Sequence, residues 1–294
     1  MSSIRAVRRY GRCVAAAAWL LACGTAPAMA QSADPNPGAI TITGATDFAS
    51  TYMFRGIRQE DDNLIVWPYF DLGIALQSGD DLFKSVAVNL GTWNSLHTGL
   101  SGSSGATGKL WYESDFYATF SVGFTGGVTL GTTYTAYTSP NSMFSTIKEL
   151  SVKGMVNLSG IKPYALVAFE FDTAPGVGQA DAGANGGTYV ELGAVPGYRL
   201  GRLDLSVPIK IGLSAGDYYE RSTIVAGRTG YVDDTFGYFS VAGTATVPLG
   251  GPSRFGTWNV HGGVEFQKLG DTTTAFNSGE DTKTIVSGGI GFTY

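Results

Sequence analysis

Cysteine and histidine are almost missing from this chain. Its 294 residues include two cysteines, Cys13 and Cys23, and two histidines, His97 and His261. Zinc sites are usually built from four Cys or His ligands, so a zinc site of that kind is nearly excluded, and we expect no metal or other cofactor. Small exported domains often depend on disulfides, but residues 31–294 contain no cysteine and must be stable without them.

Long apolar runs are also missing. After residue 30 the longest run is 64–70, which has seven residues and contains Pro68. A membrane-spanning helix needs about 20 apolar residues. Since only helices and closed barrels satisfy every backbone group in lipid, a membrane location would require a closed β-barrel.

The N-terminus has the three parts of a secretory signal peptide. Four arginines precede an apolar stretch at 13–23, Ala28-Met29-Ala30 follows, and no acidic residue occurs before Asp34. We expect cleavage after Ala30, which divides the chain into a signal peptide, 1–30, and one exported domain, 31–294. An alternative is lipidation of Cys23 within Leu20-Leu21-Ala22-Cys23.

The exported domain is acidic and rich in strand-forming residues. Four of the 19 basic residues lie in 1–30, which leaves 15 against 24 acidic residues and a net charge of −9. Such a chain does not suit nucleic acid, whose phosphates are neutralised by Lys and Arg. Over the whole chain, the 12% aromatic content and 42 glycines favour strands that bend tightly.

Alternation of apolar and polar residues recurs along the whole exported domain. In 203–213 six aliphatic residues alternate with polar or small ones, and 116–124, 190–198 and 258–266 show the same period of two. Segments of about 10 residues with this period are typical of tilted strands that cross a membrane. The pattern predicts twelve strands, near 40–56, 63–77, 83–93, 109–124, 127–138, 146–158, 162–172, 188–200, 202–214, 236–249, 256–269 and 283–294.

The connections between these segments alternate in length. Short ones, such as 78–81, 125–126 and the single residue Gly201, are separated by longer polar ones, such as 94–108 and 215–235. Short periplasmic turns and long extracellular loops are typical of outer-membrane barrels, whereas a soluble β-sandwich, the alternative, has no reason to alternate in this way. We therefore expect an all-β fold, a single transmembrane antiparallel up-and-down barrel of about 12 strands in the outer membrane of a Gram-negative bacterium.

The C-terminal segment ends on an aromatic residue. Alternation places Tyr294, Phe292 and Ile290 on one face. The order of residues, with Gly289, Phe292 and Tyr294 at the matching positions, resembles the C-terminal signal of bacterial outer-membrane barrels. The resemblance implies that the barrel-assembly machinery reads this segment; the alternative is the last strand of a soluble sandwich.

A second resemblance lies near the start of the exported domain. The run Tyr52-Met53-Phe54-Arg55-Gly56-Ile57-Arg58-Gln59 is similar to the opening of the TorF-like porins, a proteobacterial family marked by Tyr-x-Phe-Arg-Gly-Ile/Val-x-Gln. Family members usually carry a small hydroxyl residue where Arg58 stands. The resemblance implies an outer-membrane pore of undetermined substrate. Arg55 shares the alternation of Asp47, so it should point into the lumen or its mouth, and Gly56 lets the chain bend there.

Residues of inward alternation define the expected lumen. They include ten acidic side chains and six basic ones, which would give an open path a weak preference for cations, reduced by screening over about 8 Å. The alternative is that these charges pack the interior and fix the strand register. The pore-lining candidates are Asp47, Arg55, Trp67, Asp71, Glu113, Asp115, Glu149, Lys153, Glu170, Glu191, Arg199, Asp204, Lys210 and Glu265; Asp172 has the same alternation.

The expected width of the barrel sets the functional hypothesis. Eight strands enclose an interior that side chains fill, and 16 to 18 leave an open channel. Twelve strands predict a narrow pore for passive diffusion of small hydrophilic solutes or ions, with outer-membrane lipid as the surroundings and the loop near 218–234 as an obstruction. A non-conducting structural or loop-presenting barrel is the alternative. A lipid hydrolase is disfavoured because His97 lies in a Gly/Ser-rich loop, His261 faces the lumen, and Gly-x-Ser-x-Gly is missing.

Overall fold

A computed structural model describes residues 38–79, 81–103, 109–171, 178–179, 186–225, 227–251 and 253–294. The expected signal peptide and Asp172 lie outside these ranges. No helix in the described ranges is long and apolar enough to span a membrane.

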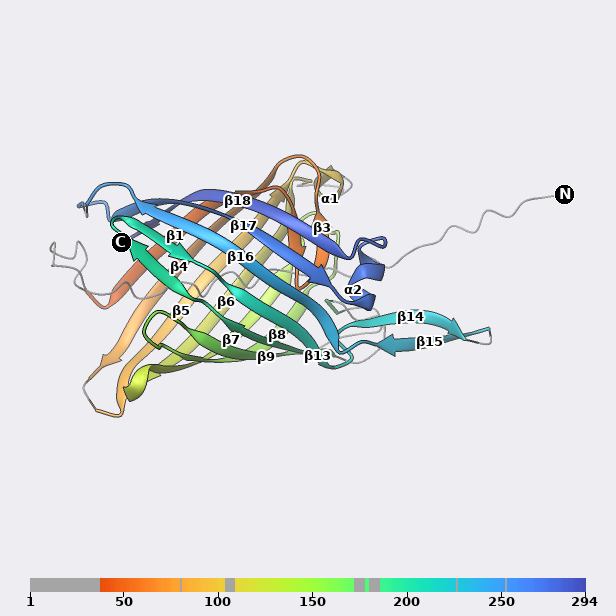
Figure 1. Ribbon diagram of the computed structural model, residues 1–294, viewed down its shortest axis with the longest axis horizontal. Helices are drawn as coiled ribbons and strands as arrows, with labels where there is room; N and C mark the ends of the chain where they lie inside the picture. Colours follow the sequence, from red (N-terminus) through yellow and green to blue (C-terminus); the bar gives the residue numbers. More distant parts are fainter. Residues whose placement is uncertain are drawn as a thin grey trace.

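Twelve antiparallel strands close into one barrel (Figure 1). Neighbouring strands follow the chain order, and the last strand, β18, pairs with the first, β1. Two of the twelve are interrupted, by residues 195–196 and by Val207-Pro208, and each is labelled as two segments. The barrel strands are β1(Ile40–Ala49), β4(Ile65–Ser78), β5(Phe83–His97), β6(Trp111–Phe124), β7(Val128–Thr138), β8(Ile147–Val156), β9(Pro163–Phe171), β10(Thr188–Ala194) with β11(Gly197–Leu200), β12(Leu203–Ser206) with β13(Ile209–Gly216), β16(Phe236–Pro248), β17(Thr257–Leu269) and β18(Thr282–Thr293).

The two ends of the barrel differ in the length of the connections between strands. We call the end with the short turns the turn end; β18 finishes there. The opposite end, the loop end, carries the longer connections and the remaining elements. These are β2(Tyr52–Phe54), β3(Ile57–Glu60), α1(Leu100–Ser103), β14(Glu220–Val225), β15(Arg228–Asp233) and α2(Asp271–Phe276), while η1(Thr125–Gly127) forms a short turn. The alternation of short and long connections is therefore confirmed.

The outer surface of the barrel is apolar. Phe48, Phe120, Leu192, Val264 and Ile290 are each more than two-fifths exposed although they lie within strands. Their sequence neighbours point inward and are less exposed, as strand alternation requires. A continuous exposed apolar belt around a closed barrel is the surface that lipid covers.

The first strand is shorter than the sequence predicts. We expected it to continue to residue 56, but β1 ends at Ala49. Residues 52–60 form a separate two-stranded ribbon, β2 and β3, that leaves the wall and folds into the lumen at the loop end. The alternation does continue through this segment, because a hairpin strand has the same period of two as the barrel strand before it.

Closure of the barrel depends on close backbone approach between β1 and β18. Gly289 is paired with Asp47, and a Cβ atom on Gly289 would lie 2.5 Å from the carbonyl oxygen of Thr46. No side chain fits there without moving the backbone of β1. Past the last paired residues, Tyr294 and Ile42 exchange two backbone hydrogen bonds, of 2.6 and 2.8 Å.

Gly289→Ala should therefore destabilise the barrel by about 1–3 kcal/mol, the usual cost of overpacking. The temperature at which heat-modifiable gel migration is lost would measure the effect. Gly288→Ala is the matched control, because a Cβ atom on that neighbouring residue would meet nothing closer than 3.4 Å. Equal transition temperatures for the two variants would contradict the close-approach argument.

Candidate functional site

The lumen at the loop end is filled by the segment that carries the Tyr-x-Phe-Arg-Gly-Ile run. We call residues 52–60 the plug hairpin. Phe54 pairs with Ile57, so Arg55 and Gly56 form a two-residue turn, and both have positive φ, 44° and 82°. Two-residue hairpin turns of this hand require such angles. Glycine suits the second position for another reason, because a Cβ atom there would lie 3.0 Å from Cβ of Tyr238 on the wall.

Arg55 anchors the tip of the plug hairpin to the wall. Its two terminal nitrogens donate to the carboxylate of Glu149 on β8 at 2.7 and 2.9 Å, and one also donates to Tyr218 Oη at 2.9 Å. The guanidinium lies 4.0 Å from the ring centroid of Tyr189, a cation–π distance. Tyr219 Oη donates to the backbone oxygen of Arg55 at 2.9 Å. These contacts fix the tip of the hairpin in one position.

Aromatic side chains pack around the base of the plug hairpin. Tyr52 is fully buried, donates to Glu113 at 2.9 Å and contacts Trp67 and Trp93 at centroid distances of 5.5 Å. Asp115, the next inward residue of β6, is buried as well. This end of the lumen is thus a packed core with few openings.

A second polar cluster lies at mid-height of the wall. Glu191 accepts hydrogen bonds from Tyr164, Tyr189 and Tyr238, at 2.7, 2.6 and 2.9 Å. The ammonium group of Lys153 lies 4.0 Å from the ring centroid of Tyr164, and Lys210 Nζ lies 3.8 Å from the carboxylate of Glu265.

Smaller pairs line the lumen nearer the turn end. Asp47 Oδ1 lies 2.5 Å from His261 Nε2. The carboxylate of Asp71 accepts from Asn89 at 2.6 Å and from Tyr117 at 2.9 Å. At the turn end itself, Arg199 donates two hydrogen bonds to Asp204, of 2.6 and 2.7 Å.

Four pairs of ionisable side chains at successive depths show how the lumen opens. The side chains are 3% and 3% exposed in Arg55–Glu149, 20% and 6% in Lys210–Glu265, and 28% and 23% in His261–Asp47. In Arg199–Asp204 they are 32% and 45% exposed. Solvent access therefore increases steadily from the plugged loop end to the turn end.

Every described residue among the pore-lining candidates is buried or half-buried in the lumen, as the alternation predicts, with the two members of Arg199–Asp204 at its rim. Glu170 is among the most buried, and its carboxylate accepts a backbone hydrogen bond from Gln179 at 2.9 Å. The loop near 218–234 is divided: Tyr218 and Tyr219 are buried in the lumen, whereas β14 and β15 project away from the barrel (Figure 1).

The prediction that His97 lies in a Gly/Ser-rich loop is wrong. It is the last residue of β5 and is fully buried, with Nε2 lying 2.5 Å from Ser95 Oγ and Nδ1 lying 2.6 Å from Ser101 Oγ. Ser101 Oγ donates to Glu60 of β3 at 2.8 Å. The chain of hydrogen bonds ties the end of the plug hairpin to β5. Trp93, Ser95 and His97 share one alternation, the signal that could have extended the strand.

The plug hairpin is also held from the loop that precedes β18. The Asn277 side chain donates to the backbone oxygen of Gly56 and accepts from the backbone N–H of Arg58, both at 2.7 Å. Beside it, Asp61 contacts Arg58 at 2.9 Å and Lys283 at 2.8 Å. Partial burial opposes ionisation of Asp61, but hydrogen bonds from Lys283 and Arg58 outweigh it and lower the pKa of this carboxyl.

The closed barrel, its apolar belt and its polar lumen together define the class: the chain is an outer-membrane β-barrel of the Gram-negative type. No family model matches the chain, and no curated protein matches it. Among solved structures it is similar to an outer-membrane channel from Pseudomonas putida F1 (9% identity, 91% of this chain and 100% of that one, TM-score 0.47). It is also similar to the outer-membrane phospholipase dimer with bound calcium from Salmonella typhi (12% identity, 88% of this chain and 94% of that one, TM-score 0.47). A third similar structure is the autotransporter translocator domain NalP from Neisseria meningitidis (14% identity, 88% of this chain and 89% of that one, TM-score 0.46).

The Arg55–Glu149 pair gives a test of how the plug hairpin is held. Arg55→Met leaves the buried Glu149 carboxylate without its cation, so we expect a loss of about 3–5 kcal/mol, and much of it should return in Arg55→Met/Glu149→Met. Arg199→Met is the control, because its partly exposed pair should contribute about 0–1 kcal/mol. Thermal unfolding in detergent, followed by circular dichroism, measures all three. A double variant no more stable than Arg55→Met would contradict this account.

Proposed function

We propose that the protein is a narrow pore for the passive diffusion of small hydrophilic solutes or ions, with a weak preference for cations. The observation that carries this proposal is the gradient of exposure along the lumen. Polar and charged side chains line a space that water enters from the turn end, and the packing becomes close only at the plug hairpin.

The width of the path supports small solutes. Side chains alone fill the interior of an eight-stranded barrel. A twelve-stranded barrel encloses more space, and here the plug hairpin occupies the additional space at the loop end. The preference for cations follows from the excess of carboxylates among the lumen residues. The carboxylate of Asp71 accepts hydrogen bonds from two neutral side chains, Asn89 and Tyr117, and these partners leave its charge available to a passing ion.

We further propose that the chain belongs with the TorF-like porins. The residues of the matching run each have a structural role in the plug hairpin: Tyr52 bonds Glu113, Arg55 bonds Glu149 and Gly56 forms the turn. Gln59 accepts from Tyr112 Oη at 2.7 Å. Arg58, which departs from the family pattern, lies in the partly exposed charged cluster at the loop end, away from the packed lumen.

Two other functions have less support. A non-conducting structural barrel is favoured by the close packing around the plug hairpin, and it is the second candidate. A lipid hydrolase has one suggestive feature, the hydrogen-bonded Ser95 and His97. Both side chains are fully buried inside the barrel, so this pair does not face lipid.

Planar-bilayer recording of the refolded chain, residues 31–294, tests the pore. We expect discrete conductance steps and a reversal potential shifted toward that of the cation in a salt gradient. Asp71→Asn should reduce this shift, because it removes a lumen carboxylate and keeps the shape. Asp81→Asn, an exposed residue of a short turn, is the control. Silence of well-inserted protein would favour the structural barrel.

The C-terminal segment has a proposed role in assembly. Phe292 lies beside Trp258, with the rings tilted and their centroids 5.3 Å apart, on the outer face near the turn end, where an aromatic girdle is expected. We propose that Gly289, Phe292 and Tyr294 form the signal read by the barrel-assembly machinery after cleavage behind Ala30.

Deleting Tyr294 should lower the amount of assembled protein severalfold, since it removes the terminal aromatic and the backbone hydrogen bonds to Ile42. The heat-modifiable fraction in outer-membrane preparations measures assembly. Tyr198→Ala, which removes an exposed aromatic of β11, is the control. Conductance of the molecules that do assemble should be unchanged; an altered conductance would assign Tyr294 to the path.

A further inference from the structure

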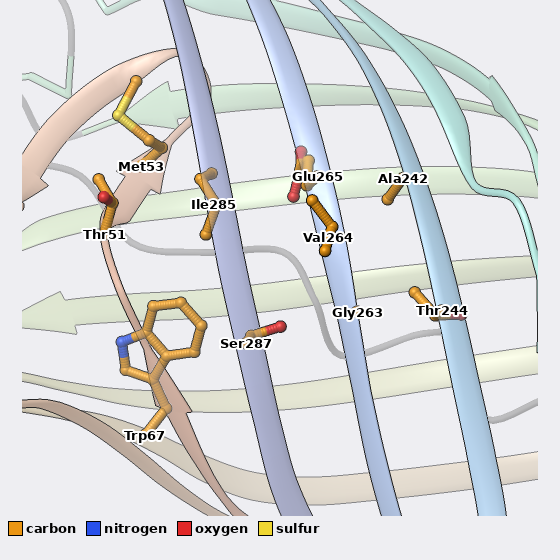
Figure 2. Close-up of a pocket in the computed structure, with 10 residues that line it drawn as sticks. All are labelled: Thr51, Met53, Trp67, Ala242, Thr244, Gly263, Val264, Glu265, Ile285 and Ser287. Carbon is orange, nitrogen blue, oxygen red and sulfur yellow. The ribbon is translucent and has the colours of Figure 1, made fainter.

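A small cavity lies between the plug hairpin and one side of the wall (Figure 2). Thr51 and Met53 border it from the plug side, Trp67 from β4, and Ala242, Gly263 and Ile285 from β16, β17 and β18. Its volume is about 20 Å³, which is enough for one water molecule. We call this contact between residues 51–53 and β16–β18 the seam.

The plug hairpin is held unequally on its two sides. Toward β6 and β8 it is fixed by hydrogen bonds to carboxylates, Tyr52 to Glu113 and Arg55 to Glu149. Across the seam, Met53 meets Ile285 in an apolar cluster, and the packing there leaves the cavity. Apolar contacts have no fixed direction, and Met is a flexible side chain that repacks readily. The polar contacts on this side lie at the tip of the hairpin, where Asn277 bonds Gly56 and Arg58, so the base at Thr51 and Met53 is the part that can yield toward β16–β18.

Below the seam, toward the turn end, the wall is lined by small residues. The inward positions of β1, β16 and β18 there include Ala45, Thr246, Gly289 and Gly291. The facing wall carries Tyr117, Tyr164 and Lys153 instead. Space inside the barrel thus lies along β16–β18 and β1, where the His261–Asp47 pair is about a quarter exposed.

We propose that solutes pass through the seam, and that Met53 and Ile285 set the width of the path. This proposal rests on the proposed pore function and assigns its constriction. The path runs from the turn end along the small-residue wall, past Asp47 and Glu265, and reaches the loop end between residues 51–53 and β18. At the seam the cavity has room for one water molecule, so the width left between Met53 and Ile285 limits the path to water and small ions.

Truncation variants test the constriction in planar-bilayer recordings. Met53→Ala and Ile285→Ala should each raise the single-channel conductance severalfold, because they enlarge the seam. Leu166→Ala is the matched control. Leu166 belongs to the same buried cluster, but it lies on β9 and does not border the cavity. Its conductance should equal that of the unmodified protein.

A conservative variant keeps the proposal testable if the truncations prevent folding. Ser287 borders the cavity, and residues 31–294 have no cysteine, so Ser287→Cys adds a single thiol at the seam. A small charged thiol reagent should block most of its current, and a reducing agent should restore it. Ser121→Cys, on the inward side of β6, should lose little current.

The outcomes separate the two proposals. If the unmodified protein conducts but Met53→Ala, Ile285→Ala and labelled Ser287→Cys all behave like their controls, the path lies elsewhere and the seam is wrong while the pore stands. If well-inserted samples of the unmodified protein and the enlarged variants are all silent, the pore itself is wrong.

Discussion

The structure depends on the requirement that every backbone group in contact with lipid has a hydrogen-bond partner. A sheet meets this requirement only by closing, and β18 closes it against β1 with seven paired positions from Thr43 to Ala49. The close approach at Gly289 and the exchange of hydrogen bonds between Tyr294 and Ile42 follow from the same closure. The apolar belt, the inward polar face and the positions of the turns are then set by alternation along strands whose register closure has fixed.

Closure with twelve strands creates a second problem, which is an interior too wide for side chains of the wall to fill. Here the first long connection fills it. The plug hairpin brings Tyr52, Phe54 and Ile57 into the barrel, and each is almost fully buried. Burying a charged tip among them is costly unless the charge is paired, and Arg55 is paired with Glu149 and surrounded by tyrosines. The run of residues that resembles the porin family is thus explained by packing inside the barrel.

Alternation predicted most of the lumen because a strand with one face in lipid shows its two faces clearly in the sequence. It predicted Glu113, Glu149, Glu191 and Glu265 as inward residues, and all four are buried. Alternation also placed Arg55 correctly in the lumen. It did so on the expectation that the first strand continues to residue 56, whereas β1 ends at Ala49. A hairpin continues the same alternation, so the sequence pattern does not reveal where the chain leaves the wall. The error at His97 has the opposite cause: glycines and serines after it suggested a loop, although the alternation of Trp93 and Ser95 continues through it.

The sequence by itself determined the class of fold, the number of strands, the lipid-facing positions and the inward charges, because period-two alternation and connection length are local properties that each segment carries alone. Only the tertiary structure decided which charges meet, how far water enters the lumen and where the plug hairpin lies against the wall. Arg55 and Glu149 are 94 residues apart in the chain, and their contact depends on barrel closure, register and the direction of one hairpin. None of these is encoded near either residue.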